Sequence, residues 1–173
     1  MIDMQQYPTG WAEIGFKPGT GWSPAALAPA FHLPLANKPA RPLAVLSRRA
    51  TKVSTLQAQP KLVGRSYATA ADTPRYLIDY GRTLQGGVNL RFAKGVAGQR
   101  VTVLLSEELL PGSGGVKVPM RTGNSFNDTW TLRAGLQTVM QHEYIEFRYA
   151  EILNSPEAIT VDNARAWVVR YPL

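Results

Sequence analysis

The stretch YLIDYGRTLQGGVNLRF, residues 76–92, decides the fold that the sequence predicts. Every other residue from 88 to 92 is apolar, which is the period-two pattern of a half-buried strand. A second strand-like run covers residues 75–80, and glycines 81, 86 and 87 separate the two runs. Because paired glycines supply the positive φ angles of a tight reversal, we predict a β-hairpin that turns between Gly81 and Gly87.

Short alternating runs separated by turn residues continue from this stretch to the end of the chain, a texture typical of a β-sandwich. The further strands are expected at residues 100–106, 128–133, 137–141, 144–153, 159–161 and 164–171. No stretch predicts a helix. The fold class is therefore all-β, an antiparallel β-sandwich of jelly-roll or concanavalin-like type over residues 75–173. Its predicted core comprises the apolar phase of each run: Val88, Leu90, Phe92, Val101, Val103, Trp130, Leu132, Phe147 and Val169.

The run 144–153 changes phase, because the residue that follows Tyr149 on its apolar face is Glu151. Such a change indicates a β-bulge or a charged group turned inward against a partner. Arg148, flanked by two aromatic residues, is expected to be partly buried and to need a carboxylate. Arg148 is thus a structural ion-pair candidate, and its candidate partners are Asp79, Glu107 and Glu108.

Residues 1–74 contain nine of the thirteen prolines and predict an extended, irregular segment laid across the sandwich. Proline removes a backbone donor, so we expect edge strands here and no central ones. Trp11, Phe16 and Trp22 lie among glycines and prolines. We expect these rings to pin a loop to the core; the alternative is sugar stacking, which makes Trp11 and Trp22 the carbohydrate-contact candidates.

The composition excludes several classes of protein. A net charge of +7 and a pI near 9.9 raise the question of nucleic acid, but the basic residues are scattered, with Arg48–Arg49 the one adjacent pair. We therefore predict no nucleic-acid partner. No run approaches the ~20 apolar residues of a membrane span and the first residues do not form a signal peptide, so a soluble chain with no membrane partner is expected. Without cysteine there is no thiolate zinc site and no clue to the compartment.

The sequence does not predict a catalytic centre. Glu107 and Glu108 form the one adjacent acidic pair, but neighbours in an extended strand point to opposite faces. His32 and His142 lack the clustered carboxylates of a triad or a transition-metal site. No catalytic residue, metal ligand or cofactor is therefore assigned, apart from a Ca²⁺ alternative through a loop with Asn124, Asn127 and Asp128. These residue types are also ordinary in turns.

Four short sequence motifs, in the order in which they occur along the chain, resemble those of a known family. They are Asp79-Tyr80-Gly81, the glycine pair 86–87, the turn and strand from Gly98 to Glu107 or Glu108, and Phe147-Arg148-Tyr149. Together they resemble the non-catalytic, concanavalin-like β-sandwich domain that precedes the catalytic barrel of bacterial α-L-rhamnosidases. The segments GWAEIGF and GWSPA near the start look like the closing strands of the preceding jelly-roll module of those enzymes.

The resemblance implies a non-catalytic accessory domain of a rhamnoside-hydrolysing glycoside hydrolase, inactive by itself. Its partners would be the (α/α)6 catalytic barrel of the same polypeptide and a rhamnose-containing glycan; the parent enzyme could be secreted or periplasmic. Residues 1–74 would be the end of a preceding module with a linker. The chain would be a fragment, a truncated gene product or an independent remnant. A free-standing carbohydrate-binding module and, from the charge alone, a nucleic-acid-binding protein are the alternative functions.

Overall fold

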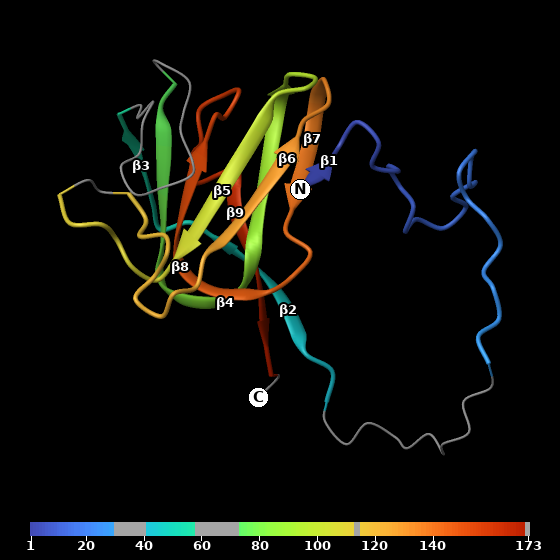
Figure 1. Ribbon diagram of the computed structural model, residues 1–173, viewed down its shortest axis with the longest axis horizontal. Coiled ribbons are helices and arrows are strands. Elements are labelled where there is room, and N and C mark those ends of the chain that lie inside the picture. The colour runs from blue at the N-terminus through green and yellow to red at the C-terminus, as the bar shows by residue number, and fades with distance from the viewer. Residues whose placement is uncertain (30–40, 58–72, 113–114, 172–173) are drawn as a thin grey trace.

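The computed structural model describes residues 1–29, 41–57, 73–112 and 115–171, and these residues form strands and loops without any helix. None of them, accordingly, belongs to a helix of the length and apolarity needed to cross a membrane. Figure 1 shows the strands as one curled body. Their bounds are β1 Ile2–Asp3, β2 Ala44–Arg49, β3 Lys52–Leu56, β4 Arg75–Gly95, β5 Arg100–Ser106, β6 Phe126–Thr131, β7 Gly135–Met140, β8 Ile145–Leu153 and β9 Ala164–Arg170.

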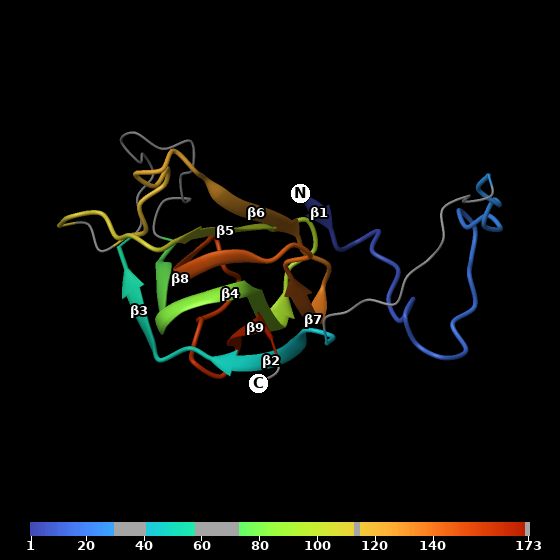
Figure 2. The same ribbon diagram turned by 90° about the horizontal axis from the view of Figure 1, so that it is seen from below.

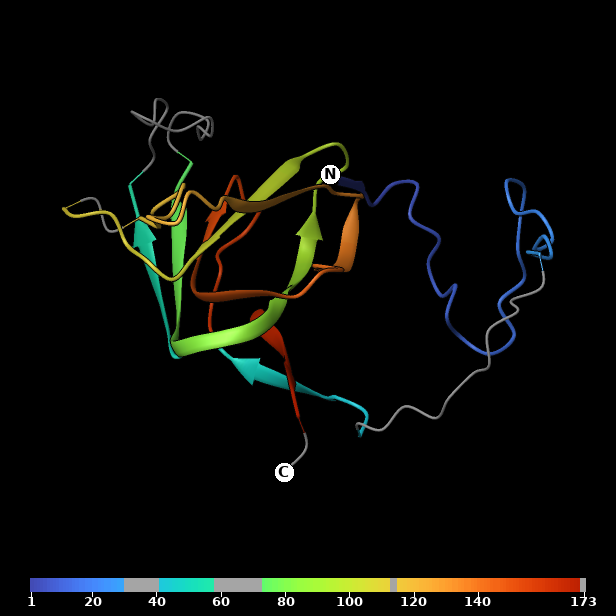
Figure 3. The same ribbon diagram turned by 60° about the horizontal axis from the view of Figure 1, so that its bottom comes forward.

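The nine strands form a single sheet that curls into two facing layers, so the predicted all-β sandwich is confirmed. One layer has the order β1-β6-β5-β8, continued by the first half of β4 and by β3. The other layer places the second half of β4 between β7 and β9, with β2 at the outer edge. All of these pairings are antiparallel apart from the short β1–β6 contact. Strand β4 therefore belongs to both layers and joins them (Figures 2 and 3).

The predicted hairpin at residues 76–92 is wrong, because β4 runs through this stretch without reversing. Both halves of β4 pair with the same strand β8 in the same sense, and the register slips between Asp79 and Leu84. Over that slip, residues 80–83 of β4 lie opposite Arg148 of β8 alone, which is a large β-bulge. Gly81, with φ of +81°, is part of it. The glycines thus bend the strand from one layer to the other.

Gly86 and Gly87 serve close packing and not a turn, since neither has a positive φ. A β-carbon on Gly86 would lie 1.9 Å from the carbonyl oxygen of Trp167 in β9. A β-carbon on Gly87 would lie 2.8 Å from the Nε1 atom of the same tryptophan. The glycine pair therefore allows the neighbouring strand β9 to lie closer to β4 than a side chain would permit.

The space between the layers is filled by side chains from the apolar phase of each strand. All nine core residues predicted from the sequence are buried, with exposed fractions of 0–9%. Apart from Val169, they form one cluster with further residues such as Ile78, Tyr80 and Ile152, and the Tyr80 ring meets Phe147 edge-on at 5.5 Å between centroids. The period-two pattern identified the core correctly because it depends on which face a residue occupies, and this does not require knowing which strands pair.

The described part of the N-terminal region contributes edge strands, as the prolines suggest, but residues 11–29 are not laid across the sandwich. Strand β1 adds to β6, β2 to β9 and β3 to β4. After β1 the chain leaves the body, and its described residues up to 29 form a separate arm (Figure 1). Residues 11–29 of this arm are exposed apart from the partly buried Phe16. The strand predicted at residues 159–161 is absent, because these residues lie in a loop that leads into a turn at 161–163. His32 lies outside the described residues.

Candidate functional site

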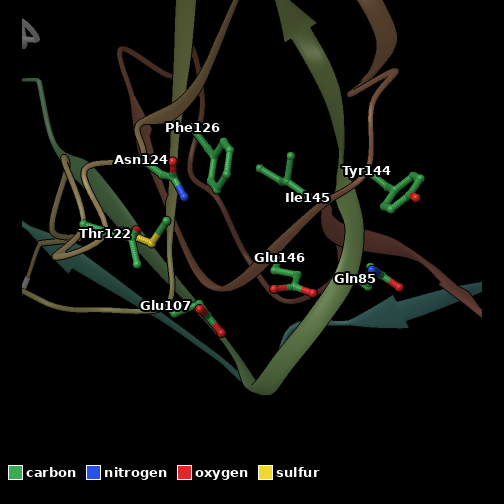
Figure 4. A pocket seen from close by; sticks show the side chains of 9 residues that line it. Gln85, Glu107, Thr122, Asn124, Phe126, Tyr144, Ile145 and Glu146 are labelled. Atoms are coloured by element: carbon green, nitrogen blue, oxygen red, sulfur yellow. The ribbon is translucent and has the colours of Figure 1, made fainter.

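An open cleft of about 450 Å³ lies where β4, β8 and the end of β5 meet (Figure 4). Gln85 of β4 stands directly opposite Glu146 of β8 in the antiparallel register. Glu107, the first residue after β5, lines the same cleft. Its remaining lining is Met120, Thr122, Asn124, Phe126, Tyr144 and Ile145. We refer to this as the Glu107–Glu146 cleft.

The Glu107–Glu146 cleft combines hydrogen-bonding groups with an aromatic surface. Gln85, Glu107 and Glu146 are all exposed side chains, and the Tyr144 ring is 56% exposed. Carboxylate and amide oxygens accept hydrogen bonds from hydroxyl groups, and an aromatic ring packs against the C–H face of a sugar. A glycosidase acid needs a desolvated carboxyl group, which an exposed glutamate in an open cleft does not provide. The arrangement suits binding of a polyhydroxylated ligand better than hydrolysis.

The loop that forms one wall of the cleft is held by Glu108. Its Oε2 accepts a hydrogen bond from Lys117 Nζ at 2.9 Å, and its Oε1 accepts from the backbone and Nε of Arg121 at 3.2 Å. The hydrogen bond from Lys117, followed by those from Arg121, keeps the pKa of Glu108 below its ordinary value. The two adjacent glutamates are thus separated in role: Glu107 faces the cleft and Glu108 anchors its wall.

Arg148 meets Asp79 at the bulge of β4. Its Nε and Nη2 donate to the two carboxylate oxygens at 3.0 and 3.1 Å, a bidentate pair, and its guanidinium carbon lies 4.8 Å from the centre of the Tyr149 ring. The side-chain hydrogen bond from Arg148 holds the pKa of Asp79 below its ordinary value, and the backbone N–H of Gly81 adds to this. Of the three carboxylates considered, the structure brings Asp79 to Arg148 and places Glu107 and Glu108 elsewhere.

A second arginine–carboxylate pair, absent from the sequence predictions, is fully buried. Arg75 Nη1 lies 2.5 Å from Glu151 Oε1, and the two side chains are 2% and 0% exposed. Glu151 Oε2 also accepts the Val116 N–H at 2.8 Å, and Arg75 Nε donates to the Gln57 carbonyl at 2.8 Å. The phase change in residues 144–153 did indicate that Glu151 turns inward. Its partner comes from the first residue of β4, 76 positions away, and no local pattern identifies it.

The two carbohydrate-contact candidates in the arm are half exposed, Trp11 at 51% and Trp22 at 50%. Trp11 donates its indole N–H to the Tyr7 hydroxyl at 3.1 Å. Trp22 packs edge-on against Phe16, with 5.5 Å between ring centroids. The expectation that these rings pin a loop to the core is wrong for Phe16 and Trp22, which contact each other in the exposed arm, whereas Trp11 is bonded to Tyr7, a residue that packs against the core. Whether either tryptophan contacts sugar stays a prediction.

The three residues of the Ca²⁺ alternative do not share one loop. Asn127 and Asp128 lie within β6, where consecutive side chains point to opposite faces, and Asp128 accepts the Gln141 amide at 2.9 Å. Asn124 instead lines the Glu107–Glu146 cleft (Figure 4). Over residues 1–29, 41–57, 73–112 and 115–171, no three His, Asp or Glu side chains are grouped as a metal site would require. His142 lies near the Tyr7 ring, 6.0 Å between centroids.

The curled β-sandwich and its open, solvated cleft define an all-β domain of the concanavalin-like class. A family model, the bacterial alpha-L-rhamnosidase concanavalin-like domain, matches residues 69–170, which is more than half of the chain. The chain belongs to this family, as the four sequence motifs indicated. No curated protein sequence matches it significantly.

Solved structures of α-L-rhamnosidases share the fold. The enzyme from Dictyoglumus thermophilum superimposes with a TM-score of 0.56 at 18% identity over 77% of this chain. The Streptomyces avermitilis enzyme, solved with L-rhamnose, gives 0.54 at 24% identity over 75%, and the Aspergillus terreus enzyme gives 0.50 at 19% identity over 75%. The matched parts are 14%, 11% and 14% of those chains, respectively. This chain therefore corresponds to one small part of each.

Proposed function

We propose that the chain acts as a non-catalytic accessory domain of an α-L-rhamnosidase-like glycoside hydrolase, packing against the catalytic barrel of the same polypeptide and contacting a rhamnose-containing glycan. Family membership supports the accessory role, because the matching domain makes up 11–14% of the similar rhamnosidase chains. The two glutamates of the Glu107–Glu146 cleft are exposed, which argues for binding and against hydrolysis.

Packing against a larger body is supported by an apolar strip at the edge formed by β2 and β9. Leu43, Val45 and Tyr171 are 40%, 66% and 69% exposed, and Val45 pairs with Val169 in register. Figure 2 shows this edge beside the C-terminal end of the chain. Exposed apolar side chains on neighbouring strands are the kind of surface at which proteins interact. The reading frame that encodes the chain is expected to continue into a helical barrel, and a frame without one would contradict this part of the proposal.

Glycan contact is assigned to the Glu107–Glu146 cleft, and the observation that carries it is the convergence of Gln85, Glu107, Glu146 and Tyr144 from separate strands and loops on one open hollow. A neutral deoxyhexose offers hydroxyl groups to the two carboxylates and the amide, and an apolar face to the tyrosine ring.

The test is an NMR titration of the full ¹⁵N-labelled chain with L-rhamnose and with an aryl rhamnoside. Amide shifts are expected at Gln85, Glu107 and Glu146, and Glu146→Gln should weaken binding. Glu143→Gln is the matched control, since it removes the same charge from an exposed residue outside the cleft. Shifts confined to the arm, abolished by Trp11→Ala, would move the contact away from the cleft. An absence of saturable shifts would reject glycan contact.

A further inference from the structure

A second hollow, of about 250 Å³, lies on the opposite side of the β4 bulge, between β2, β4 and β9. Its floor is apolar and comprises Leu46, Leu84 and Val168, of which Leu46 and Val168 are direct partners across the β2–β9 register. Arg48, Arg82 and Arg170 also line it, together with Ser47. The lining contains no carboxylate. We refer to it as the arginine pocket.

Three parts of the chain that are far apart in sequence supply the three arginines. Arg48 comes from β2, Arg82 from the bulge of β4 and Arg170 from the last position of β9. Figure 3 shows β2 and the end of β9 lying below the bend of β4. Only the tertiary fold brings these cations together, so the arrangement is not a by-product of a local run of basic residues.

The three arginines are uncompensated, as judged over residues 1–29, 41–57, 73–112 and 115–171. The structure gives none of their guanidinium groups a hydrogen bond or ion pair there, whereas Arg49, Arg75 and Arg148 are each paired with a carboxylate. The acidic groups on neighbouring segments are already occupied: Asp79 by Arg148, and Asp162 by Arg49.

The donors of the arginine pocket are the three guanidinium groups. Ser47 contributes backbone to the lining, because it alternates with Leu46 and Arg48 along β2 and its Oγ accepts a hydrogen bond from Arg165 Nε at 2.8 Å on the other face of the strand. Like charges held around one small hollow repel one another, and an anion between them removes that repulsion and accepts their N–H groups. The planar fork of arginine matches the two oxygens of a carboxylate. The site is thus complementary to an oxyanion resting on an apolar floor.

We propose that the arginine pocket binds the carboxylate of a uronic acid residue in an acidic glycan. Its volume is below the ~300–1,000 Å³ of pockets for drug-sized ligands, so it suits a single sugar ring. The carboxylate meets Arg48, Arg82 and Arg170, and the C–H face of the ring rests on Leu46 and Val168. The choice of a sugar as the carrier of the anion rests on the proposed function, whereas the choice of an oxyanion rests on the arginine pocket alone.

The experiment is a titration of the full ¹⁵N-labelled chain with D-glucuronate and D-galacturonate, and separately with glucose, sodium sulfate and a short polyglutamate peptide. Uronate should shift the amides of Ser47, Arg82 and Val168, and glucose should not. Arg82→Gln should weaken uronate binding about tenfold, the size of one lost charge-assisted hydrogen bond. Arg100→Gln removes the same charge from an exposed residue outside the pocket and should leave binding unchanged.

Three results would overturn the proposal: equal loss of binding in Arg82→Gln and Arg100→Gln, binding of sulfate without binding of uronate, or tighter binding of polyglutamate than of uronate. The neutral rhamnoside titration at the Glu107–Glu146 cleft uses other ligands and other variants. A failure of uronate binding is therefore distinguishable from a failure of the proposed function.

Discussion

The Arg148–Asp79 and Arg75–Glu151 pairs differ in burial, and this decides what each contributes to stability. Arg148 and Asp79 are 38% and 28% exposed, so water and salt screen their attraction. Arg75 and Glu151 are 2% and 0% exposed. For a buried pair the desolvation cost offsets much of the attraction, but removing one partner leaves a buried charge without compensation. The Arg148–Asp79 pair is therefore expected to contribute modestly to stability. Replacing one residue of the Arg75–Glu151 pair is expected to destabilise the domain strongly.

Asp79→Asn should destabilise the domain in a pH-dependent way. Because the folded state lowers the pKa of Asp79, the ionised form contributes stability above the unfolded value of ~3.9, and this contribution disappears as the pH falls through the lower folded pKa. The difference in unfolding free energy between wild type and Asp79→Asn is thus largest near neutral pH and shrinks in acid. Urea unfolding across the acid range measures it. Asp162→Asn, at a pair that is 55% and 79% exposed, is the control and should have little effect. A difference that grows in acid would contradict the assignment.

Glu151→Ala should cost about 3–5 kcal/mol of unfolding free energy, because the Arg75 guanidinium would remain buried without its carboxylate and the Val116 N–H would lose its acceptor. Chemical denaturation monitored by tryptophan fluorescence is a suitable measurement. The double variant Arg75→Met with Glu151→Leu removes both charges and should lose less stability than Glu151→Ala alone. If the double variant were the less stable of the two, the buried pair would be a net stabiliser.

At the scale of elements, β4 is the strand on which both layers depend. Its first half pairs with β3 and β8 and its second half with β7 and β9. Because β4 has paired neighbours on both sides in each layer, its path between the layers is tightly constrained. Two local features make this path possible. The bulge at residues 80–83 lets β4 bend, and the glycine pair at 86–87 lets the paired strand β9 approach it closely.

Gly86→Ala should destabilise the domain by more than the ~1–3 kcal/mol that is typical of overpacking, because the new methyl group meets a backbone carbonyl that is itself fixed in the β4–β9 pairing. Thermal unfolding followed by circular dichroism measures the loss. Gly19→Ala is the matched control: a β-carbon there meets nothing within 4 Å and the φ angle is not positive, so its melting temperature should be unchanged. Equal melting temperatures for the two variants would show that β9 does not approach β4 as closely as described.

At the scale of the whole molecule, the domain presents three separate surfaces around one core. The Glu107–Glu146 cleft lies where β4, β8 and the end of β5 meet, whereas the arginine pocket and the apolar strip of Leu43, Val45 and Tyr171 both lie at the β2–β9 edge. None of them contains a desolvated pair of carboxylates. The buried carboxylate of Glu151 is occupied by Arg75 and a backbone N–H and is not available to a substrate.

The purified chain is therefore expected not to hydrolyse an aryl α-L-rhamnoside. A glycosidase acid must be poised by burial, and the two glutamates of the cleft are exposed. Release of the aryl group, followed by absorbance, is the measurement. Turnover that is abolished by Glu107→Gln or Glu146→Gln, but retained in Glu143→Gln, would overturn the non-catalytic assignment.

The sequence by itself determined the fold class, the core and the family. All nine predicted core residues are buried, and the four motifs from Asp79 to Tyr149 indicated the family that the chain belongs to. These features are local. The face that a strand residue occupies follows from the period of two, and a short sequence motif can be recognised without knowing which strands pair. The local signal did not separate a tight turn from a bent strand, because glycine serves both positive φ angles and close packing.

Only the tertiary structure decided how distant residues meet. It turned the expected hairpin into the single strand β4, paired Arg75 with Glu151, and brought Glu146 to Glu107 across the cleft. Likewise it gathered Arg48, Arg82 and Arg170 around one pocket. Each of these contacts depends on the register and order of strands far apart in the chain, and strand pairing is set by the packing of the whole core, which no short pattern in the sequence encodes.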